Sequence, residues 1–209
     1  MCSSDLEVYS RLKRYGEAEP LFLRALEFLD GRPKDDPIVV LTKSYLANMY
    51  GAQKRYHKAE PLLTENLEIS RRKFGQSHPE VARRLAHLGQ NRLMQRKYAA
   101  AEPLLRECLA IRAANLPGAW ITFHARSQLG GSLLGQKKYA EAEPLVLTGY
   151  EGMQAQEAWI SGLDKKWLIE AGARIVALYD AWGKPGAAAA WRAKLHLPPA
   201  ELPANVFAL

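Results

Sequence analysis

The stretch Tyr139-Ala-Glu-Ala-Glu-Pro-Leu145 is one of four near-identical copies in this chain. Equivalent copies begin at Tyr15, Tyr56 and Tyr98, and a degenerate fifth copy begins at Pro185. The first residues of successive copies are separated by 41, 42, 41 and 46 positions. Such a regular spacing indicates a repeat protein, in which each copy is one small structural unit that packs on its neighbours.

The apolar residues inside each unit predict two helices. Thirteen residues before the alanine shared by the copies stands a large apolar residue, and twelve residues before it stands a mostly small one. A second apolar stripe follows the alanine, and both stripes have helical spacing. We expect nine or ten helices in antiparallel pairs, no strand, and the shared alanines buried where helices cross. The shared alanines are Ala59, Ala101, Ala142 and Ala188, and the large apolar residues are Leu46, Leu88, Leu129 and Ile175.

Prolines occur at two kinds of position in the repeat units, inside the second helix and in the loops between units. The motif prolines, such as Pro61 and Pro103, are predicted about four residues into the second helix, where the amides have no intrahelical acceptor and a missing N–H costs little. The loops at 31–37, 75–79 and 116–118 carry helix-stop and helix-start signals, with proline suited to the first helical turn. The predicted fold class is all-α, a right-handed superhelical solenoid of antiparallel helix pairs.

These patterns resemble the tetratricopeptide repeat family. The spacing of about 42 residues, the Tyr-x-x-Ala-Glu-Pro-Leu-Leu core and the loop Gly75 to Ala82 resemble its kinesin-light-chain-like subclass. Residues 115–195, with Trp120-Ile-Thr-Phe123 and Gly149-Tyr-Glu-Gly-Met153, are similar to the C-terminal repeat arrays that follow the catalytic domain in bacterial serine/threonine protein kinases. The first resemblance spans nearly the whole chain, and the second covers the last two units.

The sequence predicts three regions. Residues 7–197 form a tetratricopeptide-like array of about five units, and residues 198–209 form a Pro-rich C-terminal tail. Residues 1–14 are interpreted as a truncated first helix, of which residues 1–6 are candidates for non-native sequence. The reason is that Asp5 and Leu6 occupy the large apolar slot and the small slot of the repeat.

The net charge of +7 is concentrated in one part of the chain. Residues 1–53 sum to −1, residues 54–97 to +7 and residues 98–209 to +1. Clustered cations are compatible with nucleic-acid binding, because they release counterions from phosphates, but no nucleic-acid-binding module or stacking cluster accompanies them. We therefore expect a solvated basic face that steers acidic protein segments, and no nucleic-acid partner.

The sequence shows no motif for catalysis, cofactor binding or metal binding. It lacks a glycine-rich phosphate loop, the His-Arg-Asp and Asp-Phe-Gly motifs of a kinase, and histidines at metal-ligand spacing. We expect no enzyme, no cofactor and no metal site. His78 precedes a proline and is predicted to be a turn or capping residue, and Cys108 fills a small-residue slot and is predicted to be a buried structural thiol.

The aromatic residues are predicted to be structural. Tyr15, Tyr56, Tyr98 and Tyr139 recur at one repeat position and are expected between helices. Trp167, Trp182 and Trp191 are expected to cover the end of the array, because a terminal repeat has one face without a neighbour. Two cysteines and the absence of a signal or membrane-spanning segment favour a soluble cytoplasmic protein, with its oligomeric state open.

The resemblance to tetratricopeptide repeats implies a concave groove lined by the first helix of each pair, which binds peptide segments of partners. Carried over by alignment, its candidate peptide-binding residues here are Asn48, Arg83, His87, Gln90 and Gln128. Their side chains suit hydrogen bonds to an extended peptide, and the guanidinium of Arg83 suits a carboxylate. The alternative is a hydrated groove whose polar residues serve solubility.

Two functions follow from these patterns. The first is a non-catalytic protein–protein interaction scaffold that binds partner peptide segments, as a fragment of a larger protein. The second is the C-terminal regulatory or substrate-recruiting region of a bacterial serine/threonine protein kinase, whose catalytic domain is missing from this chain.

Overall fold

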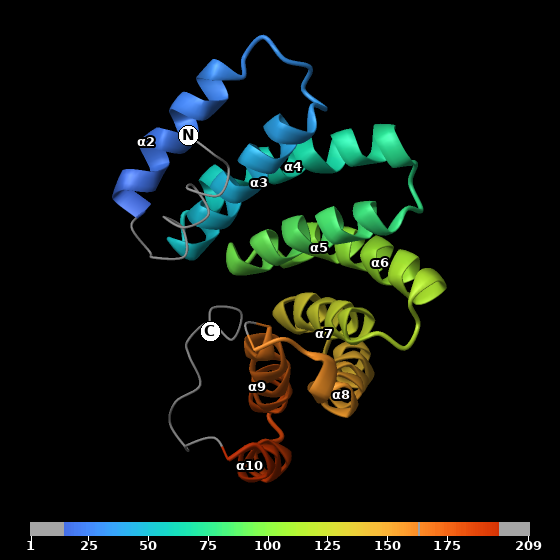
Figure 1. Cartoon of the computed structure of the whole chain (residues 1–209). Coiled ribbons are helices and arrows are strands. Elements are labelled where there is room, and N and C mark those ends of the chain that lie inside the picture. Colours follow the sequence, from blue (N-terminus) through green and yellow to red (C-terminus); the bar gives the residue numbers. More distant parts are fainter. Residues whose placement is uncertain (1–14, 163, 197–209) are drawn as a thin grey trace. The chain divides into compact units, whose positions relative to one another are not determined.

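The computed structural model describes residues 15–162 and 164–196. Within these ranges it contains nine α-helices, one short 3-10 helix and no strand (Figure 1), which confirms the predicted all-α repeat class. The predictions for residues 1–14 and 198–209 lie outside the described residues. The helices are α2 (Tyr15–Phe28), α3 (Pro37–Ala52), α4 (Tyr56–Phe74), α5 (Pro79–Met94), α6 (Tyr98–Asn115), α7 (Trp120–Gly135), α8 (Tyr139–Ala155), η1 (Glu157–Trp159), α9 (Lys165–Ala181) and α10 (Pro185–Lys194).

The chain divides into two compact units, with the boundary between Asn91 and Arg92 inside α5. In unit 1, α3 packs against α2 and α4. In unit 2, α7 packs against α6, α8 and α9, and α9 also packs against α8 and α10. Consecutive helices of a pair, such as α7 and α8, are joined by short turns, as the sequence predicts.

The shared alanines are buried, as predicted. Ala59, Ala101 and Ala142 are each 0% exposed, and the large apolar residues thirteen positions before them are also buried. The small slot has a steric reason in unit 2, since a Cβ on Gly130 would lie 2.6 Å from Cγ1 of Val146. The side chain of α8 therefore occupies the space that a larger residue on α7 would need.

The turn within each pair uses the left-handed backbone region at one repeat position. Lys54, Arg96 and Lys137 have φ of 59°, 59° and 63°, and Gly183 has φ of 73°. The next amide closes the first helix, for example the N–H of Lys138 to the carbonyl of Leu133 at 2.9 Å. This is the closure expected at a helix C-terminus, where glycine is usual, and three of the four turns place a basic residue there instead.

Two of the first helices, α3 and α5, begin with proline and a side-chain cap. Pro37 and Pro79 are the first residues of α3 and α5. A carboxylate oxygen of Asp36 accepts the amide of Ile38 at 2.8 Å, and Nδ1 of His78 accepts the amide of Glu80 at 3.1 Å. The predicted capping role of His78 is thus confirmed, and proline occupies the first helical turn without loss of a hydrogen bond.

The motif prolines lie deeper in the second helices than predicted. Each second helix begins at the motif tyrosine, so Pro61 of α4 and Pro103 of α6 are sixth residues rather than fourth residues. A proline at this position removes one hydrogen bond to the carbonyl four residues earlier. Those carbonyls belong to His57 and Ala99, which are exposed, so water can satisfy them.

The glutamate after the shared alanine links its copy to the next in the copies that contain Glu19, Glu102 and Glu143. Its carboxylate forms an ion pair with the basic residue that precedes the following second helix, at the same repeat positions each time. In two cases it also accepts the hydroxyl of a tyrosine, Tyr50 at 3.1 Å and Tyr179 at 2.8 Å. The ion pairs are Glu19 with Arg55, Glu102 with Lys138 and Glu143 with Lys184.

The recurring tyrosines lie between elements, in the half-buried layer rather than in the fully buried core. A Cβ on Gly135 of α7 would lie 2.3 Å from the ring of Tyr98, so this ring packs directly on the next helix. The Tyr139 ring stacks on Trp182 with centroids 5.9 Å apart. Trp167, Trp182 and Trp191 all pack against the buried cluster of unit 2.

Candidate functional site

The five predicted groove residues fall into two groups. Asn48 on α3 and Arg83 on α5 are exposed, and His87 and Gln90 on α5 are half-buried. All four belong to unit 1. Gln128 on α7 belongs to unit 2 and is only 1% exposed, so its side chain is not accessible to a peptide at the surface.

On each first helix of unit 1, three residues share the face that contains the predicted groove residues. On α3 these are Leu41, Tyr45 and Asn48, and on α5 they are Arg83, His87 and Gln90. Both sets have the spacing i, i+4, i+7, which places the side chains along one side of a helix. Leu41 is 43% exposed, so this face of α3 also carries an accessible apolar side chain.

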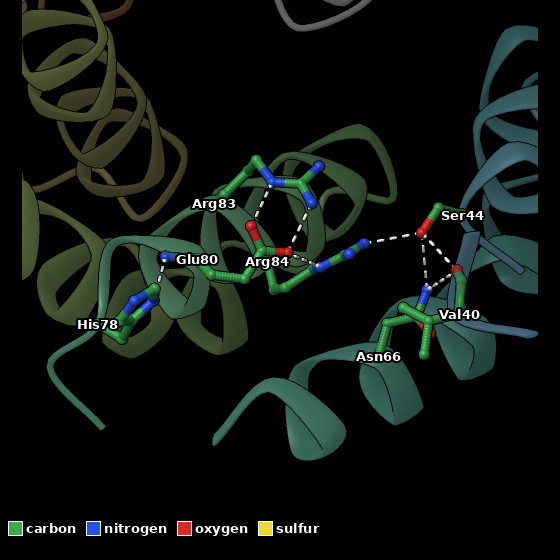
Figure 2. A network of polar contacts seen from close by, with 7 residues as sticks. All are labelled: Val40, Ser44, Asn66, His78, Glu80, Arg83 and Arg84. Carbon is green, nitrogen blue, oxygen red and sulfur yellow. Dashed lines mark hydrogen bonds and ion pairs between the residues drawn. The ribbon is translucent and has the colours of Figure 1, made fainter. Parts of the chain in front are cut away.

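A polar network joins α3, α4 and α5 beside these faces (Figure 2). The guanidinium of Arg84 donates from Nη1 to Oγ of Ser44 at 2.7 Å. Ser44 in turn donates to the carbonyl of Val40 at 2.8 Å and accepts Nδ2 of Asn66 at 3.1 Å. Ser44 thereby uses its one donor and both acceptor positions, which fixes the relative position of α3 and α5.

Glu80 binds both arginines of this network. Its Oε1 accepts Nη2 of Arg83 at 2.6 Å and Nε of Arg84 at 2.8 Å, and its Oε2 accepts Nε of Arg83 at 2.8 Å. The side chain of Arg84 is 7% exposed, whereas that of Arg83 is 50% exposed. One guanidinium is therefore buried in the helix packing, and the other lies at the surface on the same carboxylate.

The electrostatics of this cluster reflect two cations on one anion. Burial opposes ionisation of Glu80, but the hydrogen bonds and charges of Arg83 and Arg84 outweigh it and lower the pKa of the carboxyl. Burial, and then repulsion from Arg83, lowers the pKa of Arg84. The three side chains together carry one net positive charge.

Unit 2 contains a related but buried arrangement. Arg174 of α9 donates to Oγ of Ser127 on α7 at 3.1 Å and to Glu170 at 2.8 Å. The side chains of Arg174 and Glu170 are 0% and 2% exposed. Burial raises the pKa of Glu170, against the attraction of Arg174. This pair holds α9 on α7 and, being buried, offers no charged group to a ligand.

Ser44, Glu80 and Arg84 are not among the residues predicted from the sequence. The signal that could have found two of them is the spacing i, i+4 between Glu80 and Arg84, which favours an ion pair on a helix. No sequence pattern connects Ser44 with Arg84, because the two residues lie 40 positions apart in successive copies of the repeat.

The described residues offer no centre for metal or thiol chemistry. No group of three metal-ligating side chains is found in residues 15–162 and 164–196. Cys108 is 0% exposed, and burial raises the pKa of its thiol to about 11, so it stays protonated and unreactive at neutral pH. The prediction of a buried structural thiol is confirmed. Among the described helices, none is long and apolar enough to span a bilayer.

Comparisons with known proteins agree with this architecture. Residues 39–114 match the profile of the tetratricopeptide repeat family. No curated protein sequence matches the chain significantly. A Podosopora anserina protein assigned as a kinesin light chain, with nearly identical TPR-like repeats, has a TM-score of 0.72 and 16% identity, over 92% of this chain and 90% of that one.

Two further solved structures have a similar fold. BtubC (BKLC) from P. vanneervenii has a TM-score of 0.71 and 19% identity, over 91% of this chain and 75% of that one. MamA AMB-1 has a TM-score of 0.60 and 19% identity, over 92% of this chain and 94% of that one. Residues 39–114 thus match the tetratricopeptide repeat family, and the described helices have a fold similar to that of kinesin-light-chain-like repeat proteins.

Proposed function

We propose that this chain is a protein–protein interaction scaffold whose unit 1 binds an extended peptide segment of a partner along α3 and α5. The repeat fold is consistent with such a scaffold, and the family is generally non-catalytic. The observation that carries the proposal is the pair of matching faces on α3 and α5, whose polar side chains Asn48, Arg83, His87 and Gln90 reach the surface.

The chemistry of these side chains suits an extended peptide. Carboxamides such as Asn48 and Gln90 both donate and accept, so they can bond a peptide backbone that has no internal partners. Arg83 and the basic character of residues 54–97 favour a segment with acidic residues. Gln128 is left out of the proposed site because it is buried.

Peptide display tests this function directly. A library of short peptides is panned on the full chain, and the affinities of the enriched peptides are measured for the parent and for Asn48→Ala and Gln90→Ala. We expect each substitution to weaken binding about threefold to tenfold, the effect of losing one hydrogen bond. Gln76→Ala is the matched control, because Gln76 is an exposed residue of the α4–α5 loop. Failure to enrich any peptide, or equal affinity for all variants, contradicts the proposal.

We make a separate proposal about the parent protein of this scaffold and its location in the cell. The resemblance of residues 115–195 to kinase-associated repeat arrays supports a bacterial serine/threonine kinase as the parent protein, and the cysteine content supports a cytoplasmic location. The genomic sequence upstream of this chain tests the first point, since an open reading frame without kinase motifs contradicts it.

A further inference from the structure

We propose that a second copy of this chain docks on the end of unit 1 at which α2 and α4 terminate. This surface, called the loop edge, consists of residues 27–38 around the α2–α3 connection and residues 71–78 around the α4–α5 connection. The two copies are related by a two-fold axis, so that each α2–α3 connection contacts the α4–α5 connection of the other copy. The loop edge contains none of the residues of the proposed peptide site, so this inference does not rest on the proposed function.

The loop edge exposes three large apolar side chains. Phe28 is the last residue of α2 and is 86% exposed. Ile38 in the first turn of α3 is 49% exposed, and Phe74, the last residue of α4, is 43% exposed. Single apolar side chains are common on protein surfaces, but three of them at one edge indicate a contact surface.

The order of the helices brings these side chains to the same end of unit 1. Helix α3 packs against both α2 and α4, and each connection reverses the direction of the chain (Figure 1). Nδ2 of Asn66 on α4 donates to the carbonyl of Val40 on α3 at 3.4 Å. Past this contact α4 continues for about two turns, whereas α3 begins about one turn before Val40. The end of α4 with Phe74 therefore projects beyond the start of α3.

The ring of Phe74 is held in position by its neighbours. The ring of His78 stacks on it with centroids 4.7 Å apart and planes 17° from parallel. Nζ of Lys73 lies 5.6 Å from the centroid of the Phe74 ring. A ring held in this way loses little side-chain entropy when it docks, which favours its use as an anchor in a contact.

The two halves of the loop edge carry opposite charge. Residues 27–38 contain four acidic and two basic side chains, a net charge of −2. Residues 71–78 contain three basic side chains and no acidic one, a net charge of +3. The exposed members are Glu27, Asp30 and Asp35 in the acidic half and Arg72 and Lys73 in the basic half.

This division of charge is why the occupant is a second copy. In a two-fold contact, each surface element meets its counterpart twice, so the acidic half of each copy meets the basic half of the other. The same arrangement brings Phe28 and Ile38 against Phe74 of the second copy. An acidic protein or a nucleic acid would match the basic half alone and would be repelled by the acidic half.

The first arm of the test exchanges the charges. Analytical ultracentrifugation of the full chain from about 1 to 200 µM should show a monomer that converts to a dimer, less readily at about 500 mM than at about 50 mM salt. Arg72→Glu with Lys73→Glu makes both halves acidic, and Asp30→Lys with Asp35→Lys makes both halves basic. Each double variant alone should associate at least about tenfold more weakly than the parent.

An equimolar mixture of the two double variants should form the dimer again, because each acidic surface then meets a basic one. Lys165→Glu with Lys166→Glu in unit 2 is the matched control, since it makes the same change of charge at two exposed residues. This control should dimerise like the parent. A mixture that stays monomeric overturns the crossed contact.

The second arm tests the apolar side chains. Phe28→Ser should weaken the dimer about tenfold while leaving the thermal unfolding of the monomer unchanged, because the side chain is exposed there. Leu116→Ser is the control, since Leu116 is 45% exposed and directly follows α6 in unit 2. Equal weakening by both variants overturns the assignment of the loop edge.

The remaining outcomes concern the assembly itself. A chain that stays monomeric at every concentration overturns the proposal and leaves the peptide-binding function standing. Species that grow beyond a dimer as the concentration rises indicate a head-to-tail assembly and overturn the two-fold arrangement.

Discussion

At the scale of single residues, the turn between paired helices offers a direct test of backbone strain. Gly183 has φ of 73°, whereas Gly186, three residues later, lies in the first turn of α10 with open space around it. We expect Gly183→Ala to destabilise the protein by about 1 kcal/mol, because alanine resists the left-handed region. Gly186→Ala should stabilise it by about 0.5 kcal/mol through helix propensity. Urea unfolding of the two variants checks the opposite signs, and a shared sign contradicts the assignment of the turn.

The shared alanine makes a second residue-scale prediction. Ala101 is 0% exposed and packs in a buried cluster with Leu93, Leu105 and Leu129. Enlarging it in Ala101→Leu should overpack this crossing and reduce the free energy of unfolding by about 1–3 kcal/mol. Its exposed neighbour supplies the control, since Ala100→Leu should change stability by less than about 0.5 kcal/mol. Equal effects of the two substitutions would contradict the prediction that Ala101 lies at a tightly packed helix crossing.

Residues fixed by the repeat were predictable, and residues fixed by long-range contacts were not. Ala101 and Cys108 were found because copies of the repeat show what their positions tolerate. The burial of Gln128 was missed because it depends on the side chains that other helices bring, which a repeat position does not specify. The depth of the motif prolines was missed because a tyrosine is compatible with both a turn and a helix start.

At the scale of elements, the glutamate of the motif joins neighbouring copies of the repeat through hydrogen bonds and ion pairs. Glu102 accepts Gln136 at 2.7 Å and Lys138 at 3.0 Å, both from the turn that leads into α8. The sequence displayed this glutamate in four copies without indicating a partner, because the basic residues opposite it are exposed turn residues like any others. The contact of Glu102 with Gln136 and Lys138 is seen only in the structure, where one copy packs against the next.

Because the pKa of Glu102 is lowered in the folded protein, the stability of the protein should depend on this contact more at neutral pH than in acid. The hydrogen bond from Gln136, joined by those from Lys138 and Arg106, lowers the pKa to about 2, against the opposing effect of burial. Since the pKa is lower in the folded state, the carboxylate stabilises the protein above about pH 4.5 and this contribution is lost as the pH falls toward 2.

Glu102→Gln should remove this contribution. We expect a loss of about 1–2 kcal/mol at pH 7, reduced from the full shift because Lys138 and Arg106 are largely exposed, and little loss at pH 2. Chemical denaturation at both pH values measures it. Glu151→Gln on the exposed side of α8 is the control, and an equal effect at both pH values contradicts the assigned role of Glu102.

At the scale of the whole chain, the basic segment 54–97 has part of its charge already neutralised. Arg55 and Lys58 pair with Glu19, and Arg83 and Arg84 share Glu80. Arg72 and Lys73 at the end of α4 remain exposed, beside a helix terminus that itself favours cations. Such charges at the edge of a binding surface act on encounter with a ligand more than on the bound complex.

The prediction that follows concerns both the partner class and the rate of its binding. For an acidic peptide from the display experiment, raising the salt from about 50 to 300 mM should lower the association rate constant about tenfold and leave the dissociation rate constant nearly unchanged. Charge reversal in Arg72→Glu with Lys73→Glu should reproduce the loss at low salt, whereas Lys194→Glu on α10 of unit 2 should not. Duplex DNA and RNA should bind only weakly in a filter assay. Tight, salt-sensitive binding of either nucleic acid would mean that the basic segment recognises phosphates, and the acidic-peptide assignment would then be wrong.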